Sequence, residues 1–215
     1  MGLRMGSARL AVPKAALWIG LGGLVLVTIA GLLLVTFSAW TKTTFAFDEW
    51  LHGYANTALD HVALVLDKID DKYVVAAILL IGGIIIALWR GVAKALGFMV
   101  VAGVGWLLIA AVKIIVAEPR PTSFFPEIHT SDLSYPSGHV TFVMALTVAI
   151  GAVLAGSKWR WPLVVIFSVL TLATAWSRLY LGVHYPTDVI AGIIGGFSSA
   201  FFVAGVWNLL FGRRR

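Results

Sequence analysis

The chain has 215 residues, of which 60% are hydrophobic and only 12% are charged, and its formal net charge is +6. Soluble domains carry about 25% charged residues, so this composition excludes a soluble globular domain. Cysteine is absent, which excludes a disulfide framework, thiolate chemistry and zinc–thiolate sites.

Six apolar stretches are candidate membrane spans. They run over about Ala15–Phe37, Val74–Leu88, Ala93–Val116, Val140–Ala155, Pro162–Trp176 and Val189–Phe211. The first, third and sixth are long enough to cross a bilayer unaided, whereas the other three lie near the lower limit of about 17 residues. The sequence therefore predicts an all-α, polytopic membrane protein with six transmembrane helices in one domain over residues 1–215.

The first stretch follows basic residues and could be taken for a signal peptide. Its apolar run of about 23 residues exceeds the roughly 7–15 residues of a signal-peptide core. Cleavage would also leave an odd number of spans. We therefore expect an uncleaved membrane anchor.

A polar segment, residues 38–73, separates the first and second spans. Phe47, Trp50, Leu51 and Tyr54 recur at helical spacing, so we expect a short amphipathic helix lying in the membrane interface. Three nearby aspartates match no metal-binding spacing, and we expect them to form a solvated helix end; they are Asp67, Asp70 and Asp71.

The third span ends in Lys113, followed by Arg120 between two prolines. The prolines predict the end of the helix and an extended turn around Arg120. A lysine at this depth could also simply extend its ammonium group to the interface. The polar loop over residues 122–135, with Glu127, His129 and Asp132, is expected to be solvated.

The fourth span opens with Pro136-Ser137-Gly138-His139. Ser137 is a credible helix N-cap. The free N–H groups of a first helical turn bind phosphate readily, and glycine lets a ligand approach the backbone. An ordinary cap with an interfacial histidine is the alternative.

The segment from Ser177 to Asp188 joins the fifth and sixth spans and contains Arg178 and His184. Ionisable residues at the membrane edge are costly and therefore indicate function. An arginine can hold a phosphate, an imidazole can attack it, and a carboxylate can orient the imidazole. Alternatively, Asp188 could only stabilise the dipole of the sixth helix from its first turn, since Pro186 is suited to the first position of that helix.

The charges predict the orientation in the membrane. Six spans put both termini on one side, together with ten of the sixteen basic residues: Arg4, Arg9, Lys14, Arg90, Lys94, Lys158, Arg160, Arg213, Arg214 and Arg215. All ten acidic residues and all five histidines lie on the other side. By the positive-inside rule the termini are cytoplasmic and the three motifs are extracytoplasmic. The net charge is therefore a topology signal and does not indicate a nucleic-acid partner.

Lys-x6-Arg-Pro, Pro-Ser-Gly-His and Ser-Arg-x5-His-x3-Asp occur in this order, over residues 113–121, 136–139 and 177–188. In these motifs the chain resembles the phosphatidic acid phosphatase type 2 superfamily of membrane lipid phosphatases, without a departure at any motif position. The resemblance implies that His184 is a nucleophile that forms a phosphohistidine and that Asp188 orients it. His139 would be the general acid and then the general base.

The resemblance also implies a set of phosphate-binding groups: Lys113, Arg120, Arg178, the Ser137 hydroxyl and the Gly138 amide. Phosphoryl transfer mainly needs positioning and charge neutralisation, which these groups would supply. No metal and no other cofactor is implied, because the cations take the place that magnesium has elsewhere.

The expected activity is hydrolysis of a lipid phosphate ester or diphosphate at the outer face of the cytoplasmic membrane. Undecaprenyl diphosphate, converted to undecaprenyl phosphate in cell-wall biogenesis, is the first choice. Phosphatidylglycerophosphate or phosphatidic acid, in phospholipid metabolism, is the alternative. The six spans argue against a vanadate-dependent haloperoxidase, since those enzymes resemble soluble proteins, and the complete catalytic set argues against a non-catalytic membrane protein. The oligomeric state stays open.

Overall fold

The computed structural model describes residues 8–37, 39–125, 128 and 132–212. In these ranges every regular element is helical, which confirms the predicted all-α fold. The elements are α1 (Ala16–Thr36), α2 (Ala39–His52), α3 (Thr57–Leu66), the 3₁₀ helix η1 (Asp67–Asp70), α4 (Lys72–Arg90), α5 (Val92–Val116), α6 (Gly138–Val153), α7 (Arg160–Tyr180) and α8 (Pro186–Phe211).

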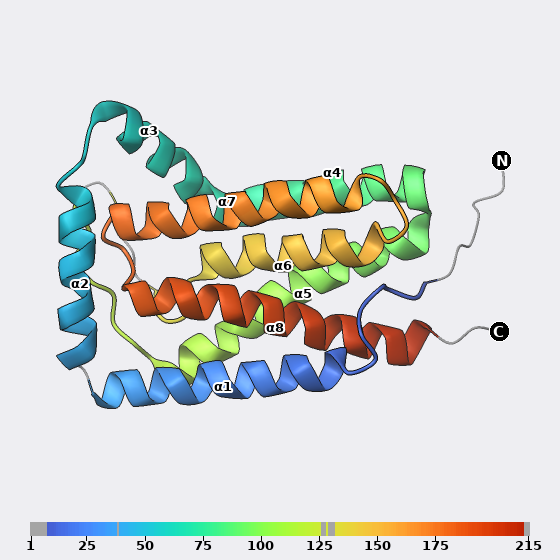
Figure 1. Ribbon diagram of the computed structural model, residues 1–215, viewed down its shortest axis with the longest axis horizontal. Coiled ribbons are helices and arrows are strands. Elements are labelled where there is room, and N and C mark those ends of the chain that lie inside the picture. The colour runs from blue at the N-terminus through green and yellow to red at the C-terminus, as the bar shows by residue number, and fades with distance from the viewer. Residues whose placement is uncertain (1–7, 38, 126–127, 129–131, 213–215) are drawn as a thin grey trace.

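Five of these helices, α1, α4, α5, α7 and α8, have the length and apolar composition of membrane spans. Helices α4 and α7 have 19 and 21 residues and exceed the apolar runs that predicted them, because each continues into its polar flanks. Helix α6 is apolar but has only 16 residues. The chain is thus a multi-pass membrane protein whose long helices lie side by side (Figure 1).

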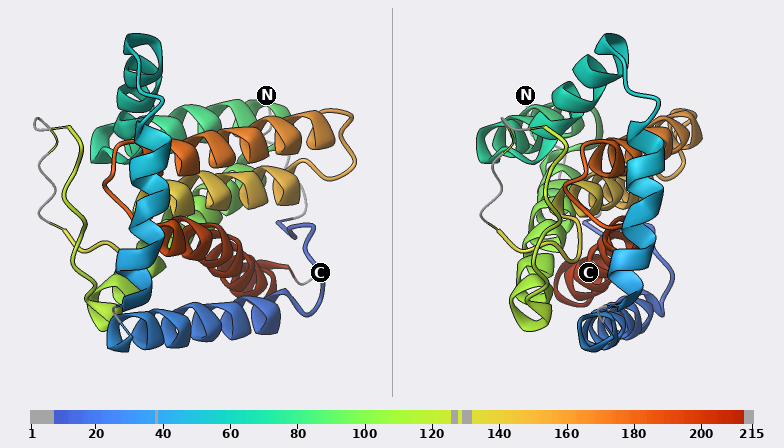
Figure 2. Two further views of the ribbon diagram at one scale, coloured as in Figure 1. Left: turned by 60° about the vertical axis from the view of Figure 1, so that its left-hand side comes forward. Right: turned by 90° about the vertical axis from the view of Figure 1, so that its left-hand side faces the viewer.

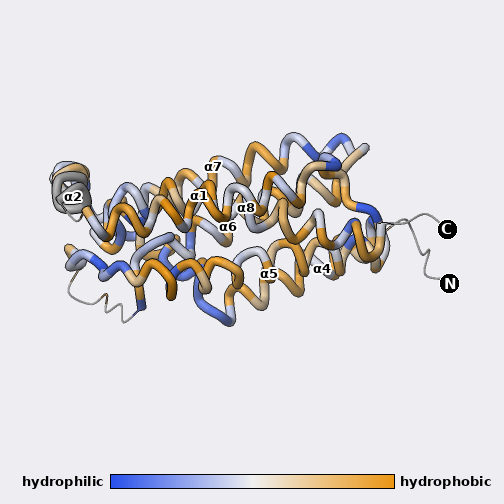
Figure 3. Tube along the Cα trace, turned by 90° about the horizontal axis from the view of Figure 1, so that it is seen from below, coloured by the Kyte–Doolittle hydropathy of each residue, from blue (hydrophilic) through white to orange (hydrophobic). Residues whose placement is uncertain are grey.

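The short helix α6 lies inside the bundle and packs against α5, α7 and α8. Most of its residues are buried, including Phe142, Leu146 and Ile150. Apolar residues colour the long helices along their length, and hydrophilic residues gather near the two ends of the bundle (Figure 3). A helix enclosed by protein in this way does not itself have to match the thickness of a bilayer.

Small residues bring α8 against α6. A Cβ on Gly196 would lie 2.6 Å from the carbonyl oxygen of Thr141, and one on Gly192 would lie 2.9 Å from that of Ser137. These separations leave no room for a side chain, as is common where membrane helices pack closely. The N-terminal ends of the two helices are therefore held next to each other.

The segment before α4 covers one end of the bundle. Helix α2 runs across that end, at a large angle to the long helices (Figure 2). Asn56 caps α3 by accepting from the backbone N–H of Ala58 and Leu59, and Asp71 caps α4 in the same way. The C-terminal ends of α5 and α7 and the N-terminal ends of α6 and α8 face this segment (Figure 1).

Candidate active site

The turn between α7 and α8 sets the position of His184. Gly182 has φ +65, a left-handed conformation that glycine adopts without strain. Tyr185 caps α8 and Pro186 begins it, which places Asp188 in the first turn. His184 Nδ1 lies 3.1 Å from Asp188 Oδ2, and both side chains are fully buried.

Two further donors hold the same oxygen of Asp188. The backbone N–H of Tyr185 donates to Oδ2 at 2.9 Å, and the hydroxyl of Ser134 donates to it as well. The carboxylate therefore cannot rotate without breaking several contacts. Its fixed position makes Nδ1 the nitrogen of His184 that carries hydrogen.

The other nitrogen of His184 faces a cation. Arg120 Nη1 lies 2.8 Å from His184 Nε2 and also donates to the carbonyl of Val183 at 2.9 Å. Since arginine is a donor only, Nε2 must present its lone pair. Burial, followed by the charges of Arg120, Lys113 and Arg178, lowers the pKa of His184 well below its ordinary value. The imidazole is thus neutral, with a lone pair directed at the cations.

Arg178 and His139 meet on the other side of the site. Arg178 Nη1 lies 3.3 Å from His139 Nε2, and Arg178 Nε donates to the hydroxyl of Ser177 at 3.2 Å. His139 Nε2 lies 2.9 Å from the carbonyl oxygen of Asp67, and its Nδ1 lies 3.3 Å from Asp70 Oδ2. His139 Nε2 therefore lies near both a carbonyl acceptor and an arginine donor, and Nδ1 lies beside a carboxylate.

Each cation of the three motifs forms an ion pair with an aspartate. Arg178 Nη1 lies 2.7 Å from Asp67 Oδ1. Lys113 Nζ lies 3.1 Å from Asp132 Oδ2, and Arg120 Nη2 lies 2.8 Å from Asp132 Oδ1. Carboxylate oxygens thus sit against the groups that the sequence predicts will hold phosphate.

A third carboxylate lies at the start of α6. A Cβ on Gly138 would lie 2.8 Å from Asp70 Oδ2. Among the described side chains, Ser137 Oγ and Arg178 Nη2 are buried donors without a hydrogen-bond partner. Unpaired donors of this kind can bind an oxyanion.

The pKa values of the aspartates differ with their partners. Burial opposes the ionisation of Asp67 and Asp132, but hydrogen bonds and charges from nearby cations outweigh it and lower both pKa values. The main cation is Arg178 for Asp67, and the cations are Arg120 and Lys113 for Asp132. Burial raises the pKa of Asp70 to about 6, although the charges of Lys113 and Arg178 oppose the rise. The first two are therefore anions at neutral pH.

Eight site residues were predicted from the sequence, and the structure brings all of them to one end of the bundle. Asp67, Asp70 and Asp132 differ from expectation, because they contact these residues and are not simply solvated. Asp71 is exposed at the start of α4, as expected of a helix end. Glu127 and His129 lie outside the described residues. Charge balance is the only sequence signal that could have indicated these aspartates, because each predicted cation needs a carboxylate partner.

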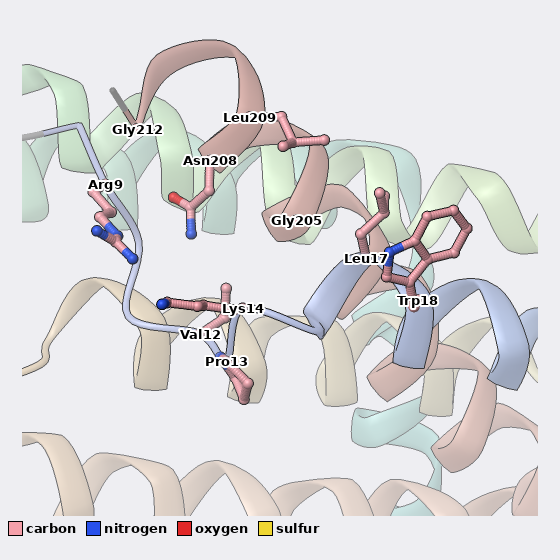
Figure 4. Close-up of a pocket in the computed structure, with 10 residues that line it drawn as sticks. All are labelled: Arg9, Val12, Pro13, Lys14, Leu17, Trp18, Gly205, Asn208, Leu209 and Gly212. Atoms are coloured by element: carbon pink, nitrogen blue, oxygen red, sulfur yellow. The ribbon is translucent and has the colours of Figure 1, made fainter. Parts of the chain in front are cut away.

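A separate cavity of about 390 Å³ lies between the start of α1 and the end of α8 (Figure 4). Its lining includes Arg9, Lys14, Trp18 and Asn208 and contains no residue of the three motifs. The residues of the three motifs therefore do not line this cavity.

Known proteins are similar to this chain in sequence. The sequence model described as PAP2 superfamily matches residues 91–211. An undecaprenyl-diphosphatase from Bacillus subtilis is 31% identical over 155 residues, which is 67% of this chain and 74% of the relative. An undecaprenyl-diphosphatase from Sulfolobus acidocaldarius is 42% identical over 89 residues, but the match covers only 39% of this chain and 41% of that relative.

A solved structure has the same fold. The crystal structure of a transmembrane PAP2-type phosphatidylglycerolphosphate phosphatase from Bacillus subtilis superposes with a TM-score of 0.75. The match covers 92% of this chain and 100% of that chain at 23% sequence identity.

Proposed function

Because the chain belongs to the PAP2 superfamily, we propose that it is a membrane lipid phosphatase that works through a phosphohistidine on His184. The observation that carries this proposal is the orientation of one imidazole. Its Nδ1 lies against Asp188, and its Nε2 faces Arg120. A neutral ring held in this tautomer is a nucleophile directed at a cationic phosphate site.

The reaction has two steps. His184 Nε2 attacks the phosphorus, and the bond from phosphorus to the leaving lipid oxygen breaks while His139 gives that oxygen a proton. His139 then takes a proton from water, which attacks the phosphohistidine and releases inorganic phosphate. Asp188 stabilises the positive charge on His184 while the intermediate exists.

Lys113, Arg120 and Arg178 neutralise the phosphoryl oxygens, with help from the Ser137 hydroxyl and the Gly138 amide. Charge neutralisation and positioning are the main requirements of phosphoryl transfer. The substrate must replace Asp67 and Asp132 on these cations, since the carboxylates hold them in the structure described above.

The topology completes the proposal. Helix α6 crosses the membrane as the fourth of six spans, and the segment containing α2 and α3 lies in the membrane interface. The termini are cytoplasmic and the site faces the outside of the cytoplasmic membrane. This orientation rests on the positive-inside rule, with Arg9, Lys14 and the α4–α5 and α6–α7 turns on one side.

Undecaprenyl diphosphate is the preferred substrate, for two reasons. Its diphosphate would lie at the outer interface, next to the site, and two relatives are named as undecaprenyl-diphosphatases. Phosphatidylglycerophosphate and phosphatidic acid are the alternatives, the former because the protein with the same fold is named for it.

The test is phosphate release by the purified protein in detergent with EDTA, with each of the three lipids as substrate. Release should be abolished by His184→Ala and unaffected by His61→Ala, which removes an exposed histidine. Trapping ³²P on the wild-type chain, and not on His184→Ala, would identify the intermediate. Equal phosphate release by His184→Ala would overturn the mechanism.

A further inference from the structure

Glu118 lies directly behind the catalytic pair, between α5 and Arg120. Ala117, at φ 54, turns the chain at the end of α5. The Glu118 carbonyl then accepts from the N–H of Ser134 at 2.8 Å. Ser134 in turn donates its hydroxyl to Asp188. The Glu118 side chain is only 3% exposed, so it needs a partner inside the protein.

That partner is Asp188. Asp188 Oδ2 receives the contacts from His184, Ser134 and Tyr185. Asp188 Oδ1 and Glu118 Oε2 are both buried and have no hydrogen-bond partner if both groups are carboxylates. The two side chains lie within hydrogen-bonding contact of each other. Two buried carboxylates in contact repel, but one proton between them turns one group into a donor for the other.

We propose that Glu118 is a positioning residue for the reaction: it stays protonated and donates a hydrogen bond to Asp188, which keeps Asp188 anionic and directed at His184. This inference rests on the proposed function, because an oriented Asp188 is useful only by fixing the tautomer in which His184 attacks. The contact between Glu118 and Asp188 differs from those that Ser134 and Tyr185 make with Asp188, because the Glu118 carboxyl group stops donating when it ionises.

The surroundings favour the proton on Glu118. Burial, then the charge of Asp188 and the hydrogen bond to it, raises the pKa of Glu118 to about 8. Tyr135, whose hydroxyl donates to the carbonyl of Val27, and Tyr185 lie near the pair in the loop before α6 and the turn before α8, and burial raises the pKa of both. They are neutral and add no charge.

Two charged groups act on Asp188 from other elements. Arg120, which contacts His184, attracts the negative charge of Asp188 and offsets part of the cost of burying it. Asp48 approaches from α2, and burial, followed by Asp188, raises its pKa to about 8 as well. Above about pH 8 Glu118 loses its proton, and the new charge repels Asp188 from its place beside His184.

The first experiment compares kcat and KM for undecaprenyl diphosphate between about pH 6 and pH 10 in four proteins: wild type, Glu118→Gln, Glu118→Ala and the control Asp48→Asn. At low pH, Glu118→Gln should stay within about fivefold of wild-type kcat because its amide still donates, whereas Glu118→Ala should lose about tenfold to a hundredfold with little change in KM. The fall of kcat above about pH 8 should persist in Asp48→Asn and vanish in Glu118→Gln.

The second experiment does not need activity or a variant. The chain has only three glutamates, Glu49, Glu118 and Glu127, so ¹³C on the glutamate carboxyl separates their infrared bands from those of aspartate. A glutamate band of a protonated carboxylic acid should be present near pH 7 and lost above about pH 8. Its absence at pH 7 would overturn the inference even if the wild type released phosphate.

Kinetics can overturn it too. If Glu118→Gln lost as much kcat as Glu118→Ala at low pH, the hydrogen-bond donor would not matter. If Asp48→Asn removed the alkaline fall in place of Glu118→Gln, the ionising group would be Asp48. A wild type that hydrolysed no lipid would reject the proposed function, while the infrared band would still decide the protonation of Glu118.

Discussion

Single protons decide what the residues of this site can do. His184 is neutral because burial and three cations disfavour its charge, and Asp188 decides which nitrogen keeps the hydrogen. Burial is the main cause that raises the pKa values of Glu118 and Asp48 to about 8, so both carboxyl groups are neutral near pH 7 beside Asp188. The site therefore combines charged and uncharged acids within a few residues, which is common where a protein separates acid and base roles.

The raised pKa values predict how stability depends on pH. An unfolded chain releases the protons of Glu118 and Asp48 near pH 4, whereas the folded chain keeps them until about pH 8. The folded state binds more protons in this window, so its stability falls as pH rises. His184, with a lowered pKa, adds the opposite slope only below about pH 6.5.

The melting temperature in detergent should therefore fall between about pH 7 and pH 8. The fall should be smaller in Glu118→Gln and in Asp48→Asn, and smallest in the double variant. A melting temperature that rose across this interval in the wild type, or fell equally in the double variant, would contradict the assignment of these two protons.

The eight motif residues could be predicted because each motif is short and lies at the end of an apolar stretch. The acidic residues could not be placed in the same way. Asp67 and Arg178 are 111 residues apart in sequence, so their contact exists only after α3 has packed against α7. Glu118 has no polar periodicity around it, and its role depends on a partner 70 positions later.

At the scale of elements, η1 carries the carboxylates that contact Arg178 and His139. It lies between α3 and α4 and packs against α6 and α7. Asp132 makes the corresponding contacts with Lys113 and Arg120 from the loop before α6. Two separate segments thus supply anions to the cations of one site. The sequence indicated a polar segment here but not that it would reach the site.

Removing such a carboxylate should strengthen the binding of a competing oxyanion. Asp67→Asn keeps the shape of the side chain but no longer neutralises Arg178, so vanadate should inhibit the variant at about tenfold lower concentration than the wild type. The exposed Asp71→Asn is the matched control and should leave inhibition unchanged. Weaker inhibition of Asp67→Asn would mean that Asp67 orients Arg178 and does not compete for it.

The contact between α6 and α8 gives a second prediction for an element. In Gly196→Ala the new methyl group would lie 2.6 Å from the carbonyl oxygen of Thr141, so the helices must separate. We expect a loss of about 1–3 kcal/mol in the free energy of unfolding. Gly22→Ala in α1 meets nothing within 4 Å and should be neutral or slightly stabilising. Equal effects of the two substitutions would mean that the close approach is not important.

At the scale of the whole molecule, charge separates the two ends of the bundle. Lys94, Lys158 and Arg160 lie near the end that holds the described parts of both termini, and the acidic residues of the site lie near the other. The apolar runs predicted six spans, and five of them are helices long enough to cross a membrane, but the enclosure of the short α6 could not be predicted. Run length reports hydrophobicity and does not tell whether protein or lipid surrounds a helix.

The absence of cysteine makes the orientation simple to measure. In intact cells a membrane-impermeant maleimide should label Lys68→Cys, whose side chain is 74% exposed at the site end. Lys158→Cys, in the turn between α6 and α7, should react only after the membrane has been made permeable. The reverse pattern would place the site in the cytoplasm and rule out the outward orientation.

The aspartates that pair with the cations also bear on turnover. In the proposed reaction three cations hold a multiply charged anion, so inorganic phosphate leaves with difficulty. Asp67 and Asp132 lie within reach of those cations and can take them back as the product departs. Their return lowers the barrier to release, since no cation is left bare in a weakly polar surrounding. In the proposed reaction the same contacts thus hinder the arriving lipid and hasten the departing phosphate.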